Sequence, residues 1–224
     1  KNSNLRGSII LFMAALLWGS TFIMQRKAAL FVGPFTFLFF RSIIAVVLLF
    51  VLSKITEKRI SVLTCLDKKK IIIFACMAGV SLFFASAFQQ IGLETISASK
   101  SGFITSMYMI LVPIIGLFFK EKIKSYLWAF VLIAIIGSYL LSTTSGLSFG
   151  FGELITLLGA LFFAFQIIFV DKTSKFINPY KFCMIQIAIV AILSFIMMLI
   201  FEEVSFINVK KAFWFMVYAG VISS

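Results

Sequence analysis

Long apolar runs alternate with short polar gaps along the whole chain. A helix that crosses the hydrocarbon core of a bilayer needs about 20 apolar residues, and lipid offers its backbone no hydrogen-bond partner. Seven runs meet this length, and an eighth begins near the last residue. We therefore expect an all-α polytopic membrane protein with spans near 8–25, 34–53, 71–92, 101–119, 126–143, 152–170, 182–201 and 212–224.

The composition strengthens this prediction. Hydrophobic residues make up 62% of the 224 residues, the mean hydropathy is +1.14, and 29 residues are Phe. Soluble domains contain only about half apolar residues. A soluble helical protein is the alternative, and the length of the apolar runs argues against it.

The distribution of charge predicts an orientation. A net charge of +12 would suggest a nucleic-acid partner for a soluble protein, but here Lys and Arg gather in the gaps between spans, as in cytoplasmic loops. With the N-terminus inside, 14 of them lie on the cytoplasmic side and 5 on the opposite side, while Arg41 lies within a span. We predict a multi-pass plasma-membrane protein with a cytoplasmic N-terminus, a lipid bilayer around it and no nucleic-acid partner.

Catalytic and metal-binding patterns are missing from the sequence. It contains no His, and Cys65, Cys76 and Cys183 match no metal-ligand spacing. A membrane enzyme would need paired Asp residues, a Ser–His arrangement or metal ligands. We predict no catalytic residue, no metal, no cofactor and no enzymatic activity.

The acidic residues avoid the middle of every expected span. Those near spans lie at their ends: Glu94, Glu153, Asp171 and Glu202. Proton-coupled carriers commonly hold a carboxylate or a His within the membrane. If the protein is a carrier, the sequence therefore predicts facilitated or exchange transport.

The chain repeats itself after 145 residues. The shift matches an ordered series after the first span: Lys27 with Lys172, Phe31 with Phe176, Pro34 with Pro179 and Phe37 with Phe182. The first unit, 1–145, holds five spans, and this odd number inverts the second unit, 146–224, which is incomplete. A complete pair would have ten helices, of which about seven and a half are present. Inverted repeats allow alternating access; alternatively, the duplication merely builds a stable bundle.

Four motifs resemble EamA-type permeases of the drug/metabolite transporter superfamily. They are AALLWGSTFIMQRKA (Ala14–Ala28), GPFTFLFFR (Gly33–Arg41), SASKSGFITSMYMILVPIIGLFFKEKI (Ser97–Ile123) and GELITLLGALFFAFQIIFVDK (Gly152–Lys172). The resemblance implies two inverted five-helix units with both ends cytoplasmic. It also implies export or uptake of small metabolites, often amino acids or related compounds. The chain departs from the family by C-terminal truncation.

Arg41 is the most prominent candidate for substrate contact. It lies about two turns into the second span, where it would attract a substrate carboxylate or phosphate. The alternative is that its side chain reaches back to the outer headgroups.

Lys100, Thr105 and Tyr108 form a second candidate group, at the outer entry of the fourth span. Thr105 and Tyr108 are spaced to share a helix face. The alternative for Lys100 is an interfacial anchor paired with Glu94.

The repeat predicts a central site. Trp18, Thr21 and Gln25 share one face of the first span, and the 145-residue shift matches Thr21 with Gln166 and Arg41 with Gln186. An in-plane twofold would bring these positions together, and Gln89 and Gln90 are further candidates of the same kind. The alternative is that these side chains form hydrogen bonds that hold helices together.

Pro113 is a candidate hinge in the fourth span. It lacks the backbone donor that would bind the carbonyl of Met109, so a kink is expected. The kink would serve gating, or it would be passive. By contrast, the row Gly152, Thr156, Ala160, Ala164 is expected to serve helix packing.

Two functions remain. The first is a transmembrane permease or exporter of small metabolites that works by alternating access on a small-molecule substrate. The alternative is a non-transporting membrane scaffold or receptor. The sequence does not distinguish a monomer from a homodimer.

Overall fold

The computed structural model describes residues 2–56, 68–118, 129, 132–133, 136–137, 150–173 and 178–223. Within these ranges every regular element is a helix, and six helical segments are long and apolar enough to cross a membrane. The elements are α1 (Asn2–Ala28), α2 (Pro34–Thr56), α3 (Lys68–Gly92), α4 (Ala98–Ser106), α5 (Tyr108–Phe118), α7 (Phe151–Thr173), α8 (Pro179–Phe201) and α9 (Phe206–Ile222).

The helices match the spans expected from hydropathy. The first, second, third, sixth and seventh spans correspond to α1, α2, α3, α7 and α8, and α4 with α5 forms the fourth. Most of the expected fifth span, 126–143, lies outside the described residues. The eighth begins at Phe206 rather than near 212, because a helix can extend past its apolar run and carry Lys210 and Lys211.

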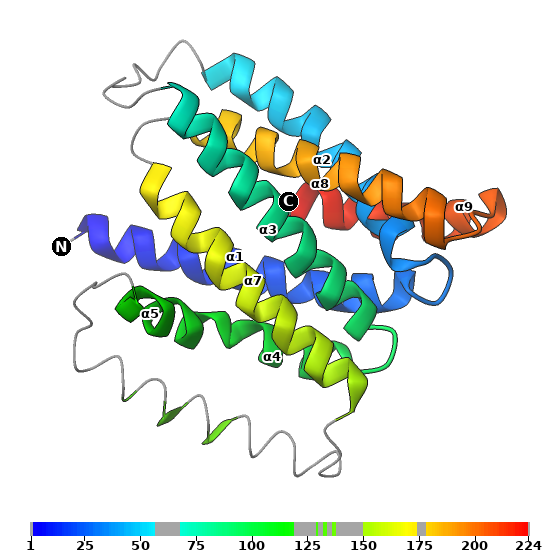
Figure 1. Cartoon of the computed structure of the whole chain (residues 1–224), viewed down its shortest axis with the longest axis horizontal. Helices are drawn as coiled ribbons and strands as arrows, with labels where there is room; N and C mark the ends of the chain where they lie inside the picture. Colours follow the sequence, from blue (N-terminus) through cyan, green and yellow to red (C-terminus); the bar gives the residue numbers. More distant parts are fainter. Residues whose placement is uncertain are drawn as a thin grey trace.

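Helices from distant parts of the chain pair with one another (Figure 1). The main neighbours are α3 with α7, α2 with α8, and α1 with α9, while α4 and α5 pack on α7. Large apolar side chains such as Leu199, Ile200 and Trp214 are exposed on the outside of the bundle. Because lipid solvates such side chains, this exposure is consistent with a membrane location.

Small residues bring α3 and α7 into close contact. A Cβ added at Gly92 would lie 2.0 Å from Thr156 Oγ1 and 2.9 Å from the carbonyl oxygen of Gly152. A Cβ added at Gly159 would lie 3.0 Å from the carbonyl oxygen of Ala85. Gly152, Thr156, Ala160 and Ala164 are all buried in α7, so the packing role expected for this row is confirmed.

The fourth span is interrupted at Met107 rather than at Pro113. Met107 N–H donates to the carbonyl of Ile104, three residues back, at 3.1 Å. The Ser106 hydroxyl also donates to the carbonyl of Phe103, at 2.6 Å, and such back-bonding bends helices. Pro113 lies inside α5, which continues through it. A hinge at Pro113 therefore stays a prediction.

We predict that Gly92→Ala destabilises the bundle. The added methyl group must push α3 and α7 apart, at a cost of about 1–3 kcal/mol in the free energy of unfolding. Thermal unfolding in detergent measures this loss. The matched control is Gly19→Ala, where an added Cβ meets nothing within 4 Å. Equal stability of the two variants would contradict the close α3–α7 contact.

Candidate functional site

A small cavity lined by both polar and aliphatic side chains lies among α2, α3, α7 and α8 and reaches the residue after α9. We call it the Arg41 cavity, and its volume is about 160 Å³. Its lining residues are Arg41, Ser42, Leu82, Ser86, Gln166, Cys183, Gln186, Ile187, Val190 and Ser223. The structure thus brings together Arg41, Gln166 and Gln186, which lie far apart in the sequence.

The guanidinium of Arg41 has weak partners. Its Nη2 lies 3.4 Å from Ser86 Oγ, and its Cζ lies 5.8 Å from the centre of the Phe37 ring. Its Nε is buried without a hydrogen-bond partner in the described part of the chain. Across the cavity, Gln166 Nε2 donates to Gln186 Oε1 at 2.9 Å. The site therefore combines a partly buried cation with a hydrogen-bonded pair of amides.

A larger cavity lies between α1 and the α4–α5 span. This Trp18 cavity measures about 420 Å³ and is lined by Trp18, Thr105 and Tyr108 together with small and apolar residues. The rings of Trp18 and Tyr108 lie 6.2 Å apart, and Trp18 also meets Phe163 edge-on at 6.5 Å. Aromatic walls of this kind suit the apolar body of a ligand.

The remaining polar candidates are buried and bonded to neighbouring helices. Gln89 Nε2 donates to Thr105 Oγ1 at 3.0 Å, joining α3 to α4. Gln90 Nε2 donates to the carbonyl of Gln25 at 3.3 Å, joining α3 to α1. Within α1, Gln25 Nε2 reaches Thr21 Oγ1 at 3.4 Å. The two bonds between helices are of the kind that holds membrane helices together. None of the four residues Thr21, Gln25, Gln89 and Gln90 lines either cavity.

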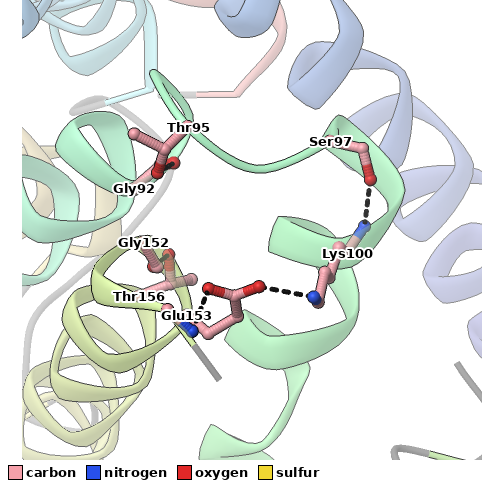
Figure 2. Close-up of polar contacts among 8 residues, drawn as sticks. Gly92, Thr95, Ser97, Lys100, Gly152, Glu153 and Thr156 are labelled. Atoms are coloured by element: carbon pink, nitrogen blue, oxygen red, sulfur yellow. Dashed lines mark hydrogen bonds and ion pairs between the residues drawn. The ribbon is translucent and has the colours of Figure 1, made fainter. Parts of the chain in front are cut away.

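Lys100 pairs with Glu153 rather than with Glu94 (Figure 2). Its Nζ donates to Glu153 Oε1, and the side chains are 14% and 8% exposed. Glu153 Oε2 also accepts from the Gly150 N–H at 3.0 Å. Sequence proximity favoured Glu94, but the α3–α7 contact places the start of α7 beside the start of α4. The ion pair thus ties these two helices.

Glu94 instead lies exposed in the turn between α3 and α4. Its pKa is raised above the ordinary value, first by partial burial and then by the negative charge of Glu202. The positive charge of Arg26 acts in the opposite direction. Glu94 is therefore part of a separate charge group at this end of the bundle.

Glu202 caps α2 from the end of α8. Its carboxylate accepts from the N–H groups of Phe35 and Thr36, at 2.7 and 2.8 Å, and from Thr36 Oγ1 at 2.6 Å. Asn178, directly before α8, caps that helix with its own side chain. Gly33, directly before α2, has no side chain, and a Cβ there would meet the Glu202 carboxylate at 2.4 Å. The sequence signal for this contact was Gly33 directly before Pro34, because a glycine at the N-cap position has no side chain that could cap the helix.

One end of the bundle therefore carries three ties between helices. We call it the tied end. They are Lys100–Glu153 between α4 and α7, Glu202 on α2, and Arg26 Nη1 donating to the carbonyl of Leu93 between α1 and α3. Sequence reasoning missed all three, because each joins residues that are at least 53 positions apart.

These features define a multi-pass helical membrane protein with polar side chains turned inward. Residues 5–143 match the EamA-like transporter family, and the chain belongs to this family. An uncharacterized transporter of Archaeoglobus fulgidus is 34% identical over 185 residues, which make up 82% of this chain and 55% of that protein. The chain thus spans about half the length of this curated relative. Membership confirms a transporter-family membrane protein that is not an enzyme.

We predict a measurable coupling between Lys100 and Glu153. A double-mutant cycle with Lys100→Met and Glu153→Gln should give about 1–2 kcal/mol, above most exposed ion pairs, because both side chains are mostly buried. Thermal unfolding in detergent provides the free energies. The control cycle joins Lys100→Met with Glu94→Gln and should give a coupling near zero. The reverse ranking would restore Glu94 as the partner of Lys100.

Proposed function

We propose that the chain forms part of a carrier for small metabolites, built from inverted units at 1–145 and 146–224. The helix bounds support the repeat, since α2 and α8 both have 23 residues and begin and end 145 positions apart. The pairing of helices supports the inversion. In the proposed repeat, α7, α8 and α9 are the counterparts of α1, α2 and α3. Exchanging each helix with its counterpart turns the α1–α9 contact into the α7–α3 contact and leaves the α2–α8 contact unchanged. A pseudo-twofold axis has this property.

One observation carries the proposal. Arg41 and Gln186 occupy equivalent positions in the two units, and both line the Arg41 cavity. Carriers built from inverted repeats hold their substrate where the repeats meet, near the middle of the membrane. A polar cavity made by equivalent residues of α2 and α8 has this location and chemistry.

Transport would proceed by rocking of the two units about this cavity. With the N-terminus in the cytoplasm, the tied end faces outward, and its bonds hold the outer side shut. Substrate would then enter from the cytoplasmic side, opposite to the tied end. Breaking the ties would open the outer side. The Trp18 cavity, with Thr105 and Tyr108, offers an apolar surface along the path. Amino acids or related compounds are the substrates that the family resemblance favours, carried by facilitated or exchange transport.

Flux separates this function from a scaffold or receptor. The full-length protein in proteoliposomes should take up one class from a pool of labelled amino acids and related metabolites. Gln186→Leu should lower that flux about tenfold or more, because a polar contact to the substrate is lost. The control is Ser194→Ala, which alters a buried α8 hydroxyl outside the cavity and should retain flux. Substrate binding without any flux would favour a receptor.

Cys183 reports on access to the cavity. It lines the Arg41 cavity and is exposed. A charged thiol reagent reaches it only through water, because lipid excludes charged groups. In a Cys65→Ala, Cys76→Ala background, we predict faster modification from the cytoplasmic side. Glu153→Gln should raise the rate from the outer side, since it loosens the tied end. Equal rates from both sides in every variant would contradict alternating access.

A further inference from the structure

The Arg41 cavity holds a positive charge without a counter-ion. None of the lining residues that the structure describes is acidic. Among the described residues, the guanidinium has one hydrogen-bond partner, the neutral hydroxyl of Ser86 at 3.4 Å, and its Nε is buried without a partner. A buried cation is costly unless an opposite charge and hydrogen bonds compensate it. Such a group is consistent with a site that is completed by an anionic ligand.

The neighbouring groups are also suited to an anion. The Gln166–Gln186 bond occupies the carbonyl oxygen of Gln186, which leaves the amide hydrogens of Gln186 available as donors. Ser42 and Ser86 add hydroxyl donors to the lining. A guanidinium surrounded by further donors matches the geometry of a carboxylate, which Arg binds through two parallel hydrogen bonds.

The size and the apolar wall limit the rest of the ligand. Leu82, Ile187 and Val190 provide an aliphatic surface, and no aromatic residue lines the cavity in its described part. At about 160 Å³, it is smaller than the roughly 300–1,000 Å³ of pockets that hold drug-sized ligands. A ligand of a few carbon atoms fits this space.

We infer that the Arg41 cavity binds small aliphatic carboxylates and favours them over amino acids. The ligand carboxylate pairs with Arg41 and its short chain packs on Leu82, Ile187 and Val190. An amino acid would bring a second cation beside the partly buried guanidinium, and none of the lining residues that the structure describes is acidic. Like charges that are removed from water repel. This inference rests on the proposed function and, within the substrates proposed there, favours short carboxylates related to amino acids over the amino acids themselves.

Binding to the full-length protein in nanodiscs at pH 7.5 tests the inference, with thermal unfolding as the readout. Three probes carry the same branched four-carbon chain on their carboxyl or amide carbon and differ in charge. They are the anion isovalerate, its neutral amide isovaleramide, and the zwitterion valine. Isovalerate should raise the unfolding temperature most, valine less, and isovaleramide should have no effect. Equal shifts with isovalerate and isovaleramide, or a larger shift with valine, would overturn the inference.

Variants at Arg41 separate binding from a structural role. Arg41→Gln should weaken isovalerate binding about 10- to 100-fold, because a charged hydrogen-bond partner is lost. Without ligand, it should unfold at a higher temperature than the wild type, since an uncompensated charge is removed. Arg41→Lys, which keeps the charge but not the paired donors, should bind with intermediate affinity. Lys54→Gln, at the other end of α2, removes the same charge and should leave binding unchanged.

The outcomes distinguish this inference from the proposed function. If isovalerate binds more strongly than isovaleramide and valine but no flux is measured in proteoliposomes, transport is overturned and the carboxylate site is kept. Flux that Arg41→Gln leaves intact would keep transport and overturn the site. A loss of stability in Arg41→Gln without ligand, together with an unchanged isovalerate shift, would assign Arg41 to packing.

Discussion

Lipid cannot hydrogen-bond to a polar side chain, so every polar group carried by a span must find its partner between helices. This constraint decides how the spans are turned. Gln25, Gln89 and Gln90 bond across α1, α3 and α4, while apolar side chains face outward. Arg41 differs from these amides because it carries a charge that its described neighbours do not neutralise. The same constraint that organises the bundle thus leaves the charge of Arg41 uncompensated in the part of the chain that the structure describes.

Two cavities of different chemistry follow from this arrangement. The Arg41 cavity is small, largely aliphatic and positively charged, and it lies where α2 and α8 pack together. The Trp18 cavity is larger and has aromatic walls. One is suited to recognising a charged group, and the other to accommodating a range of apolar shapes. At the tied end, Lys100–Glu153 and Glu202 on α2 join helices of residues 1–145 to helices of residues 146–224, whereas Arg26–Leu93 lies within 1–145. Small changes in charge there would alter how firmly the two proposed units are held.

Hydropathy was enough to predict where most helices lie, because the length of an apolar run is a local property. The 145-residue shift indicated that Arg41, Gln166 and Gln186 would lie together, and all three line one cavity. Thr21, which the same shift matches with Gln166, lines neither cavity. The partner of Lys100 could not be predicted, since it depends on how closely α7 approaches α3 at Gly92. The break at Met107 was also missed. Pro113 was the stronger local signal, but the back-bond from Ser106 to Phe103 lies where the helix is interrupted.

The pairing of helices has a consequence for biosynthesis. The main partners of α1, α2 and α3 are α9, α8 and α7, all from the second unit. Even the first turn of α2 receives its cap from a carboxylate 166 residues later in the chain. While a ribosome is still making residues 146–224, Gln89 and Gln90 can bond to α4 and α1, but the first turn of α2 and Lys100 still lack their partners. The spans of residues 1–145 must be held by the insertion machinery or by transient contacts until α7 and α8 arrive, and assembly of the two halves becomes a single late event.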